Sequence, residues 1–486
     1  MRHYDLAVIG TGPAGQKAAI QAAKLGKSVA IIEKSASLGG AAINTGTIPS
    51  KALREAVMHL TGASKRGLFG ESYRVKRHIT LADLIYVSQQ VIHHERELIR
   101  SHFDSNNVDL LFGAAEFDSP KTLRVEREDE FELVSADHFL IGTGTRPATP
   151  AHVPFDGKTI FTSDELLRLE SLPKTMIVVG GGVIGVEYAC MMATLGVKVT
   201  LVEGRNEVLG FLDHEITEAF QYQMRRMGIT LRLGEKVAAI EQIKHEGNGH
   251  GDGNGNGNGN GNGNGTGASA KVRAILESGK QLQAAALLYA VGRQGTTMAL
   301  GLDKAGLTTD DRERLKVNTN FQTTVPHIYA AGDVIGFPAL ASTAMEQGRL
   351  AVCHMFGSPI CSMPELFPFG IYAIPEISMV GKTEKQLTDA GIPYEAGVAL
   401  YKELARGQLL GDLDGMLKLL IHQKEHTILG VHAIGSGATE LIHIGQAVMA
   451  LNGKVDYFIN NVFNFPTLAE AYRVAALNGL NKLRHV

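Results

Sequence analysis

The sequence predicts an α/β fold made of two similar βαβ units and a C-terminal α+β domain. A pattern of strand, glycine turn, helix and strand occupies residues 4–34, and the same pattern returns at residues 175–205. After about residue 364 the chain shows strands and then helices without a glycine turn, as α+β domains do. The 486 residues are enough for about three domains of ordinary size.

The composition is typical of a globular protein, with 44% hydrophobic and 20% charged residues. A net charge of −3 predicts neither a nucleic-acid partner nor an anionic membrane partner. The chain begins directly with a short strand, and we find neither a signal-peptide pattern nor an apolar run of about 18 residues. Its cysteines Cys190, Cys353 and Cys361 are too few for a disulfide framework. Free, unreactive thiols are favoured over a disulfide between Cys353 and Cys361. These features predict cytoplasmic residence.

The first βαβ unit carries the hexapeptide GTGPAG at residues 10–15, between its strand and its helix. Gly10 permits the tight turn, Gly12 lets a pyrophosphate approach the backbone, and Gly15 lets the helix pack on the strand. The helix N-terminus adds N–H donors and partial positive charge. Glu33 stands 18 residues beyond Gly15 and can accept hydrogen bonds from both hydroxyls of a ribose. These residues therefore predict a dinucleotide site.

The second unit repeats the four positions at a constant spacing of about 170 residues, as Gly180, Gly182, Gly185 and Glu203. Two dinucleotide sites in one chain suggest one permanently bound cofactor and one that exchanges. Glu203 favours NAD(H), because its carboxylate binds a free 2′-hydroxyl and repels a 2′-phosphate. Arg205 offsets that repulsion if its side chain turns inward, so the use of NADP(H) stays open.

These patterns divide the chain into three domains. The first is discontinuous and consists of residues 1–150 and 289–360, the second is 151–288, and the C-terminal domain is 361–486. Within the second domain the Gly/Asn-rich segment 246–267 has nothing to bury, so it is expected to be a disordered hairpin tip.

Other patterns are interpreted as structural. A long amphipathic helix is expected from about Thr80 to Ser105. Its His93 and His94 are interpreted as part of a solvated face, because adjacent residues point apart on a helix. His250 and Asp252 in the Gly/Asn-rich segment are too isolated to form a metal site, so no metal is expected.

Motifs along the whole chain resemble those of the pyridine nucleotide–disulfide oxidoreductase family. The resemblance implies that the permanent cofactor is FAD, that Gly144 and Gly292 belong to cofactor-binding segments, and that Asp333 binds the ribitol chain of the flavin. It also implies that the C-terminal domain forms the interface of a homodimer or a larger homo-oligomer. The motifs are FLIGTGTRP at residues 139–147, where the chain is expected to cross to the second domain, YAVGRQ at 289–294 and IYAAGDVIG at 328–336.

The chain departs from the disulfide reductases of that family at the residues that carry dithiol chemistry. Their two cysteines and their C-terminal histidine correspond here to Ala42, Thr47 and Phe465. None of these three side chains can form a disulfide or transfer a proton near neutral pH. Dithiol chemistry is therefore excluded, and Thr47 is kept as a candidate cofactor-binding residue.

Hydride transfer through a flavin needs no sulfur, because the protein need only hold the rings close together and tune the charge beside them. The resemblance places Lys51 beside the flavin N5 as an electrostatic stabiliser of the reduced flavin, with Glu187 as its ion-pair partner. A purely structural buried ion pair is the alternative. The segments at 45–56 and 463–481 are especially similar to the soluble pyridine nucleotide transhydrogenases, which have threonine and an aromatic residue at the corresponding places.

The sequence therefore predicts FAD-dependent hydride transfer between NADPH and NAD+, with NAD(H) and NADP(H) as exchanging substrates of a ping-pong reaction. Nicotinamide dinucleotides are the expected partners, without nucleic acid or membrane. Two alternatives stay open. An NAD(P)H:quinone or dye reductase would use the same flavin site with an open acceptor pocket, and a non-catalytic flavoprotein would bind the nucleotides without turnover.

Overall fold

The computed structural model divides into two compact units. The first comprises Met1–Ala148 and Gly292–Val486, and the second comprises Thr149–Val291. The segment 246–267 and the residues His250, Asp252 and Cys361 lie outside the described residues. The structure describes residues 2–70, 72–128, 130–243, 271–359 and 362–483.

A largely parallel sheet forms the N-terminal part of the first unit. Its strand order is β3-β2-β1-β6-β5-β4, and β17 also pairs with β6. The strands β1, β2, β3, β6 and β17 pair in parallel, whereas β4 and β5 form an antiparallel extension. Residues 6–9 of β1 and 29–32 of β2 are buried apolar runs, because both faces of a parallel sheet are covered. The bounds are β1 (Arg2–Ile9), β2 (Val29–Glu33), β3 (Asp109–Phe112), β4 (Ala114–Ser119), β5 (Thr122–Arg127), β6 (Glu130–Ile141) and β17 (Ile328–Ala330).

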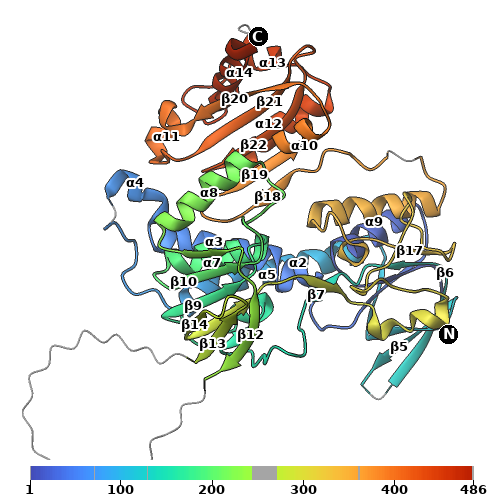
Figure 1. The fold of residues 1–486 in the computed structure, drawn as a ribbon. Coiled ribbons are helices and arrows are strands. Elements are labelled where there is room, and N and C mark those ends of the chain that lie inside the picture. The colour runs from blue at the N-terminus through green and yellow to red at the C-terminus, as the bar shows by residue number, and fades with distance from the viewer. Residues whose placement is uncertain (1, 71, 129, 244–270, 360–361, 484–486) are drawn as a thin grey trace, which may run out of the picture. The chain divides into compact units, whose positions relative to one another are not determined.

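Helices α1 and α9 pack against each other in this part of the first unit (Figure 1). Their approach is so close that a Cβ added to Gly348 of α9 would lie 2.1 Å from the carbonyl oxygen of Ala14. Helix α1 starts at Pro13, whose fixed φ suits a first helical residue. The helices are α1 (Pro13–Lys24), α2 (Gly40–Asn44), α3 (Thr47–Leu60), α4 (Arg66–Phe69), α5 (Leu81–Ser105) and α9 (Ala341–Met355), with short 3₁₀ turns η1 (Ala63–Lys65), η2 (Met298–Leu300), η3 (Leu302–Ala305) and η4 (Asp333–Ile335).

The predicted long helix is confirmed as α5. It begins with a capping box, in which Thr80 and Asp83 satisfy each other's backbone N–H groups. His93 is exposed and lies 3.2 Å from Glu97 on the next turn, as expected of a solvated face.

The C-terminal part of the first unit, residues 369–483, is an antiparallel sheet covered by helices. Its strand order is β18-β19-β22-β21-β20. Helix α12 packs on β19 and β22, and α14 packs on β20 and β21, in the orange-to-red part of Figure 1. The strands are β18 (Phe369–Ile371), β19 (Ile377–Gly381), β20 (Tyr394–Leu400), β21 (Met416–His422) and β22 (Ile428–Ile434). The helices are α10 (Glu384–Asp389), η5 (Tyr401–Glu403), α11 (Ala405–Leu410), α12 (Ala438–Ala450), α13 (Asp456–Asn460) and α14 (Glu470–Leu483).

The second unit has its own parallel sheet of order β11-β10-β9-β15-β8 and an antiparallel sheet of order β12-β13-β14. Gln242 of β12 pairs with Val272 of β13, so the two strands predicted on either side of the Gly/Asn-rich segment do form a ladder. The parallel strands and helices are β8 (Ile160–Phe161), α6 (Ser163–Leu166), β9 (Thr175–Val179), α7 (Val183–Thr194), β10 (Lys198–Glu203), α8 (His214–Arg226), β11 (Thr230–Leu233) and β15 (Ala286–Tyr289). The antiparallel strands are β12 (Val237–Gln242), β13 (Val272–Leu276) and β14 (Gln281–Ala284).

The chain leaves and rejoins the first unit through two paired strands. β7 (Thr145–Pro147) and β16 (Arg293–Gly295) form an antiparallel ladder. The N–H of Ala148 donates to the carbonyl oxygen of Gly292 at 3.2 Å. Both ends of the inserted second unit therefore start from one place on the first unit.

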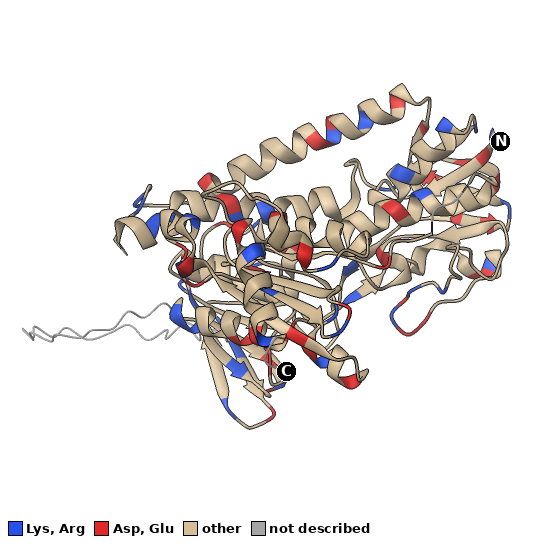
Figure 2. Cartoon of the chain, turned by 90° about the horizontal axis from the view of Figure 1, so that it is seen from above, with Lys and Arg blue, Asp and Glu red and all other residues tan. Residues whose placement is uncertain are grey.

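Basic and acidic residues are interspersed along the described chain in the view of Figure 2. Neither sign of charge is confined to one segment of the chain in that view. Among the described helices, none combines the length and the apolar character that crossing a membrane requires.

Candidate functional site

The glycine turn of the first unit is shaped by three different requirements. Gly10 has a φ of +101°, and a Cβ there would lie 2.7 Å from the carbonyl oxygen of Gly142. A Cβ on Gly15 would lie 1.9 Å from the carbonyl oxygen of Gly10, so helix and strand meet too closely for any side chain. A Cβ on Gly12 would meet only one atom within 4 Å, at 3.9 Å. Gly12 therefore faces open space at the helix N-terminus, as a pyrophosphate site requires.

The second unit repeats this geometry closely. Gly180 has a φ of +108°, and its added Cβ would lie 2.6 Å from the carbonyl oxygen of Ala290. The added Cβ of Gly185 would lie 1.9 Å from the carbonyl oxygen of Gly180, and that of Gly182 would meet nothing within 4 Å. The residues of each predicted glycine set therefore come together in a turn, and the two turns have the same local geometry.

Glu33 ends β2 at the carboxyl edge of the first sheet, beside the glycine turn. Its Oε2 accepts from the N–H of Thr11 at 3.1 Å and from the hydroxyl of Thr11 at 2.6 Å. Its Oε1 accepts from the N–H of Ser35 at 3.0 Å. These bonds fix the buried carboxylate next to the turn. Sequence reasoning missed Thr11, although its place inside the glycine motif was a signal for such a role.

Glu203 ends β10 at the equivalent edge of the second sheet. Its Oε2 accepts from the N–H of Gly181 at 2.6 Å, and its Oε1 accepts from the N–H of Arg205 at 2.9 Å. The Arg205 guanidinium adds two bonds, from Nε to Oε1 at 3.0 Å and from Nη2 to Oε2 at 3.1 Å. Burial raises the pKa of the Glu203 carboxyl, but the hydrogen bonds from Arg205 and Gly181 outweigh burial and hold that pKa below its usual range. The inward turn of Arg205, which the sequence left open, is thus present.

The segments that cross to the second unit also hold predicted cofactor-binding residues. Gly144 and Gly292 both have positive φ, +64° and +83°, and an added Cβ at either position would meet nothing within 4 Å. The hydroxyl of Thr145 donates to Asp333 at 3.2 Å and accepts from Nε of Arg293 at 2.8 Å. Asp333 is therefore bonded to β7 directly, and Thr145 links it to Arg293 of β16.

The first unit also offers a polar group that suits a bound dinucleotide such as FAD. The hydroxyl of Thr143 is buried and has no hydrogen-bond partner among the described residues. Buried hydroxyls are normally hydrogen-bonded, so this one fits a bound polar ligand. Thr143 lies in the same loop as Gly142 and Gly144, next to the turn at Gly10. The residues present therefore fit the group that the motifs imply.

Helix α3 carries the segment in which the reductase cysteine is replaced. Thr47 is exposed at the start of α3, and Ala42 lies on the preceding short helix α2. The Nζ of Lys51 lies 4.9 Å from the ring centroid of Tyr372 and donates to the hydroxyl of Ser50 at 3.3 Å. A cation over an aromatic face is attracted by the ring quadrupole, so Tyr372 helps to hold the ammonium. Sequence reasoning missed Tyr372.

Glu187 is buried in helix α7 of the second unit. Its expected pairing with Lys51 of the first unit stays a prediction. The pKa of the neighbouring Tyr188 hydroxyl is raised, because the side chain is fully buried and lies beside the Glu187 carboxylate.

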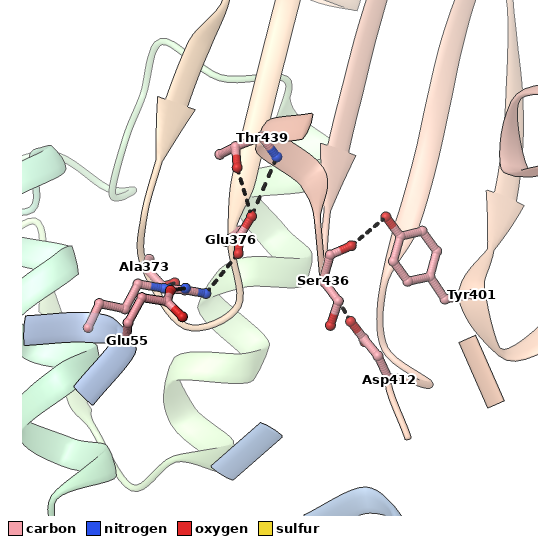
Figure 3. A network of polar contacts seen from close by, with 8 residues as sticks. Glu55, Ala373, Glu376, Tyr401, Asp412, Ser436 and Thr439 are labelled. Carbon is pink, nitrogen blue, oxygen red and sulfur yellow. Dashed lines mark hydrogen bonds and ion pairs between the residues drawn. The ribbon is translucent and has the colours of Figure 1, made fainter. Parts of the chain in front are cut away.

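A polar network ties α3 to the C-terminal part of the first unit (Figure 3). Buried Arg54 donates from Nε to the carbonyl oxygen of Ala373 at 2.9 Å and pairs through Nη2 with Glu376 at 3.2 Å. The same carboxylate accepts from the hydroxyl of Thr439 at 2.9 Å. Arg54 also contacts exposed Glu55 at 2.6 Å. The helix that carries Lys51 is thus fixed to the chain segment that carries Tyr372.

The described cysteines do not belong to this segment. Cys190 and Cys353 are buried free thiols in α7 and α9. Phe465, at the place of the reductase histidine, is 72% exposed. An alanine, a threonine and a phenylalanine thus occupy the three positions that dithiol chemistry would need.

Each unit places a glycine turn and a buried acid at the carboxyl edge of a parallel sheet. The protein therefore has two dinucleotide-binding folds. Residues 4–348 match the profile of the pyridine nucleotide-disulphide oxidoreductases, and residues 367–476 match the dimerisation domain of the same proteins. The chain therefore belongs to the pyridine nucleotide-disulphide oxidoreductase family. The predicted fold class is confirmed.

Relatives with assigned names are similar over the full length. The chain is 51% identical to a soluble pyridine nucleotide transhydrogenase of Mycobacterium tuberculosis, covering 100% of this chain and 98% of that protein. It is 43% identical to a soluble pyridine nucleotide transhydrogenase of Photobacterium profundum, covering 99% and 98%. Among solved structures, the HOCl-induced flavoprotein disulfide reductase RclA from Escherichia coli superimposes with a TM-score of 0.83 at 26% identity, covering 98% and 99%.

Proposed function

We propose that the protein is an FAD-dependent NAD(P)+ transhydrogenase, which transfers hydride between NADPH and NAD+ in a ping-pong reaction. One observation carries this proposal. The flavin-site segment has Ala42 and Thr47 where a dithiol would stand, in a chain similar from end to end to transhydrogenases. Without a sulfur relay, exchange of hydride between nicotinamides is the two-electron flavin chemistry that the named relatives support best.

FAD, when bound in the first unit, supplies a hydride acceptor and donor that both nicotinamides can share. The open backbone at Gly12 would accept its pyrophosphate, with Gly10 and Gly15 shaping the turn. Glu33 would accept from the ribose hydroxyls, and Asp333 would bind the ribitol chain. The further residues proposed to line this site are Thr47, Gly144 and Gly292.

NAD(H) and NADP(H) would exchange at the second unit. Gly182 leaves the same open backbone there, and Gly180 and Gly185 set the turn and the helix packing. Glu203 would bind the adenosine ribose. The residues of this unit would hold and orient the nucleotide, and the positive charge beside the reacting rings would come from the first unit.

Lys51 is proposed as the electrostatic residue, with Glu187 as its partner. Its ammonium, held over the face of Tyr372, would stabilise negative charge that develops beside it. Because α3 is fixed through Arg54 to Ala373 and Glu376, that ammonium is kept in place before a substrate binds. Such pre-organisation is what electrostatic stabilisation of a reaction requires.

We further propose that the protein forms a homodimer through its C-terminal domain and works in the cytoplasm. Large exposed apolar side chains on that domain, including Leu451 at 82% and Val462 at 92%, support an oligomer interface. The free thiols of Cys190 and Cys353 support a reducing compartment. The three-domain division at residues 150, 288 and 360 is retained as part of this proposal.

The proposal is tested by anaerobic titration of the purified holoenzyme with NADH and, separately, with NADPH, followed by flavin absorbance. Both should bleach the flavin, and NADPH should then reduce a spectrally distinct NAD+ analogue with the parallel double-reciprocal lines of a ping-pong reaction. Bleaching by only one nucleotide would contradict transhydrogenation. A parallel assay with a quinone as acceptor measures the alternative reductase activity directly.

A further inference from the structure

The two dinucleotide units of this chain differ at the carboxylate that ends the second strand. In the first unit, Glu33 receives bonds from Thr11 and from the backbone N–H of Ser35. The positions that correspond to Thr11 and Ser35 in the second unit are Gly181 and Arg205. The backbone bonds are the same in kind, but only the second carboxylate is also bound by a guanidinium. The first unit therefore serves as an internal reference for the second.

Among the described residues, the side-chain hydrogen bonds of the Arg205 guanidinium go only to Glu203, so it keeps spare donors. Of its five N–H groups, Glu203 takes one from Nε and one from Nη2. The Arg205 side chain is 55% exposed, whereas the Glu203 side chain is only 10% exposed. The unused donors can therefore bond to water or to a ligand beside the glycine turn, while the bonded edge stays on the carboxylate.

The charges around Glu203 are balanced, so they leave room for a ligand that carries a phosphate. A buried carboxylate alone would repel a 2′-phosphate, but a bidentate ion pair removes most of that repulsion. A second cation lies close by, because the stem of Lys236 lies across Gly204, where a Cβ would be 3.1 Å from the Lys236 Cγ. The hydrogen bond to Glu203 and, more weakly, the charge of the other nearby acid, Glu207, raise the pKa of Arg205.

We propose that the Glu203–Arg205 pair is the selector that lets one nucleotide site accept both NAD(H) and NADP(H). With NAD(H), the exposed arginine moves aside and Glu203 accepts from the ribose hydroxyls. With NADP(H), Arg205 donates its free N–H groups to the 2′-phosphate while its other edge neutralises Glu203. This inference rests on the proposed function, since it concerns how that reaction takes both substrates.

The test measures binding of two ligand fragments to the holoenzyme by calorimetry, so that no hydride transfer intervenes. The fragments are 5′-AMP and adenosine 2′,5′-bisphosphate, which differ only in the 2′-phosphate. Arg205→Gln should weaken binding of the bisphosphate at least about tenfold and leave 5′-AMP within about threefold of wild type. The matched control is Lys198→Gln, which removes an exposed cation at the other end of the same strand and should change neither affinity.

A second variant reports on the carboxylate. Glu203→Gln should shift the ratio of the two affinities in the opposite sense, toward the bisphosphate, while weakening 5′-AMP. An Arg205→Gln variant that loses both fragments by the same factor, or neither, overturns the selector. If the enzyme transfers hydride but the affinity ratio does not shift, the proposed function stands and the selector is refuted. If the affinity ratio shifts but the enzyme transfers no hydride, the selector stands and the proposed function is refuted.

Discussion

At the scale of single residues, the glycines of the two turns act in two distinct ways. Gly15 and Gly185 exclude any side chain, because a Cβ would lie 1.9 Å from a backbone oxygen. Gly12 and Gly182 have negative φ values of −65° and −79° and leave open space. The first pair is therefore required by the fold, and the second pair is required only by a ligand.

This difference predicts a reciprocal result for two alanine variants. Gly12→Ala should weaken flavin retention at least about tenfold, because the added methyl occupies the pyrophosphate space, with a change below about 1 kcal/mol in unfolding free energy of the flavin-free protein. Gly182→Ala should stay yellow but need at least about ten times more nucleotide for half-reduction. Flavin content and anaerobic titration measure both. Each variant is the control of the other for flavin content, and loss of flavin by Gly182→Ala or undiminished flavin retention by Gly12→Ala would contradict the assignment.

The Glu203 carboxyl predicts a pH dependence of stability. Its folded-state pKa lies below its unfolded value of about 4.3. The stabilisation is therefore present above about pH 4.3 and is lost as pH falls through the folded pKa. Arg205→Gln removes the strongest of the bonds that lower this pKa, so its unfolding free energy should fall less than that of wild type between about pH 5 and about pH 3.5. Urea unfolding at several pH values measures this, and equal losses in both proteins would refute it.

The sequence reveals the glycines and acids at this scale because each follows a buried strand at a fixed spacing. Arg205 is different. An exposed arginine has many rotamers of similar energy, so its position depends on a carboxylate whose orientation only the folded backbone defines. Thr143 is hidden for a related reason, since an unpartnered hydroxyl is recognised only when its surroundings are known.

At the scale of elements, α3 is fixed by a contact between distant segments. Arg54 and Ala373 are separated by 319 residues in the chain. No periodicity or local motif predicts such a pair, whereas α5 is visible as an amphipathic pattern. The two βαβ units and α5 could therefore be read from the sequence, but the contact that holds α3 against the C-terminal part could not.

Breaking this contact should destabilise the first unit. Glu376→Gln leaves the buried Arg54 guanidinium without its buried counter-charge and should lower the unfolding free energy by about 3 kcal/mol. Glu55→Gln is a matched control, because it removes an exposed carboxylate from the same arginine and should cost less than about 0.5 kcal/mol. Denaturant unfolding followed by circular dichroism compares them. Equal effects of the two variants would show that the buried pair contributes no more to the unfolding free energy than the exposed pair.

At the scale of the whole molecule, apolar side chains remain exposed on the C-terminal domain. Leu451, Val462 and Phe465 are 82%, 92% and 72% exposed in the single chain. Scattered exposed apolar residues are ordinary, but several of this size on one domain are typical of an interaction surface. The sequence indicated this surface only through family resemblance, because exposure of an apolar residue depends on the complete fold.

The proposed homodimer predicts the effect of a charge at this surface. Val462→Asp should raise the dimer dissociation constant at least about tenfold, since an unpaired carboxylate would be buried on association. Phe131→Asp is the control, because Phe131 is also exposed, at 57%, but lies on β6 of the N-terminal part. Sedimentation velocity over a range of concentrations distinguishes them. Dissociation by Phe131→Asp alone would assign the interface to the other part of the unit.

The hydrogen bond from Ala148 to Gly292 makes residues 149–291 a cassette with neighbouring ends. After excision of this segment, a short turn could join Ala148 to Gly292. The shortened protein should still bind the yellow flavin, but no nicotinamide nucleotide should reduce it. The same topology gives a simple route of descent, in which a duplicated βαβ ancestor was spliced into its own copy without disturbing the recipient sheet.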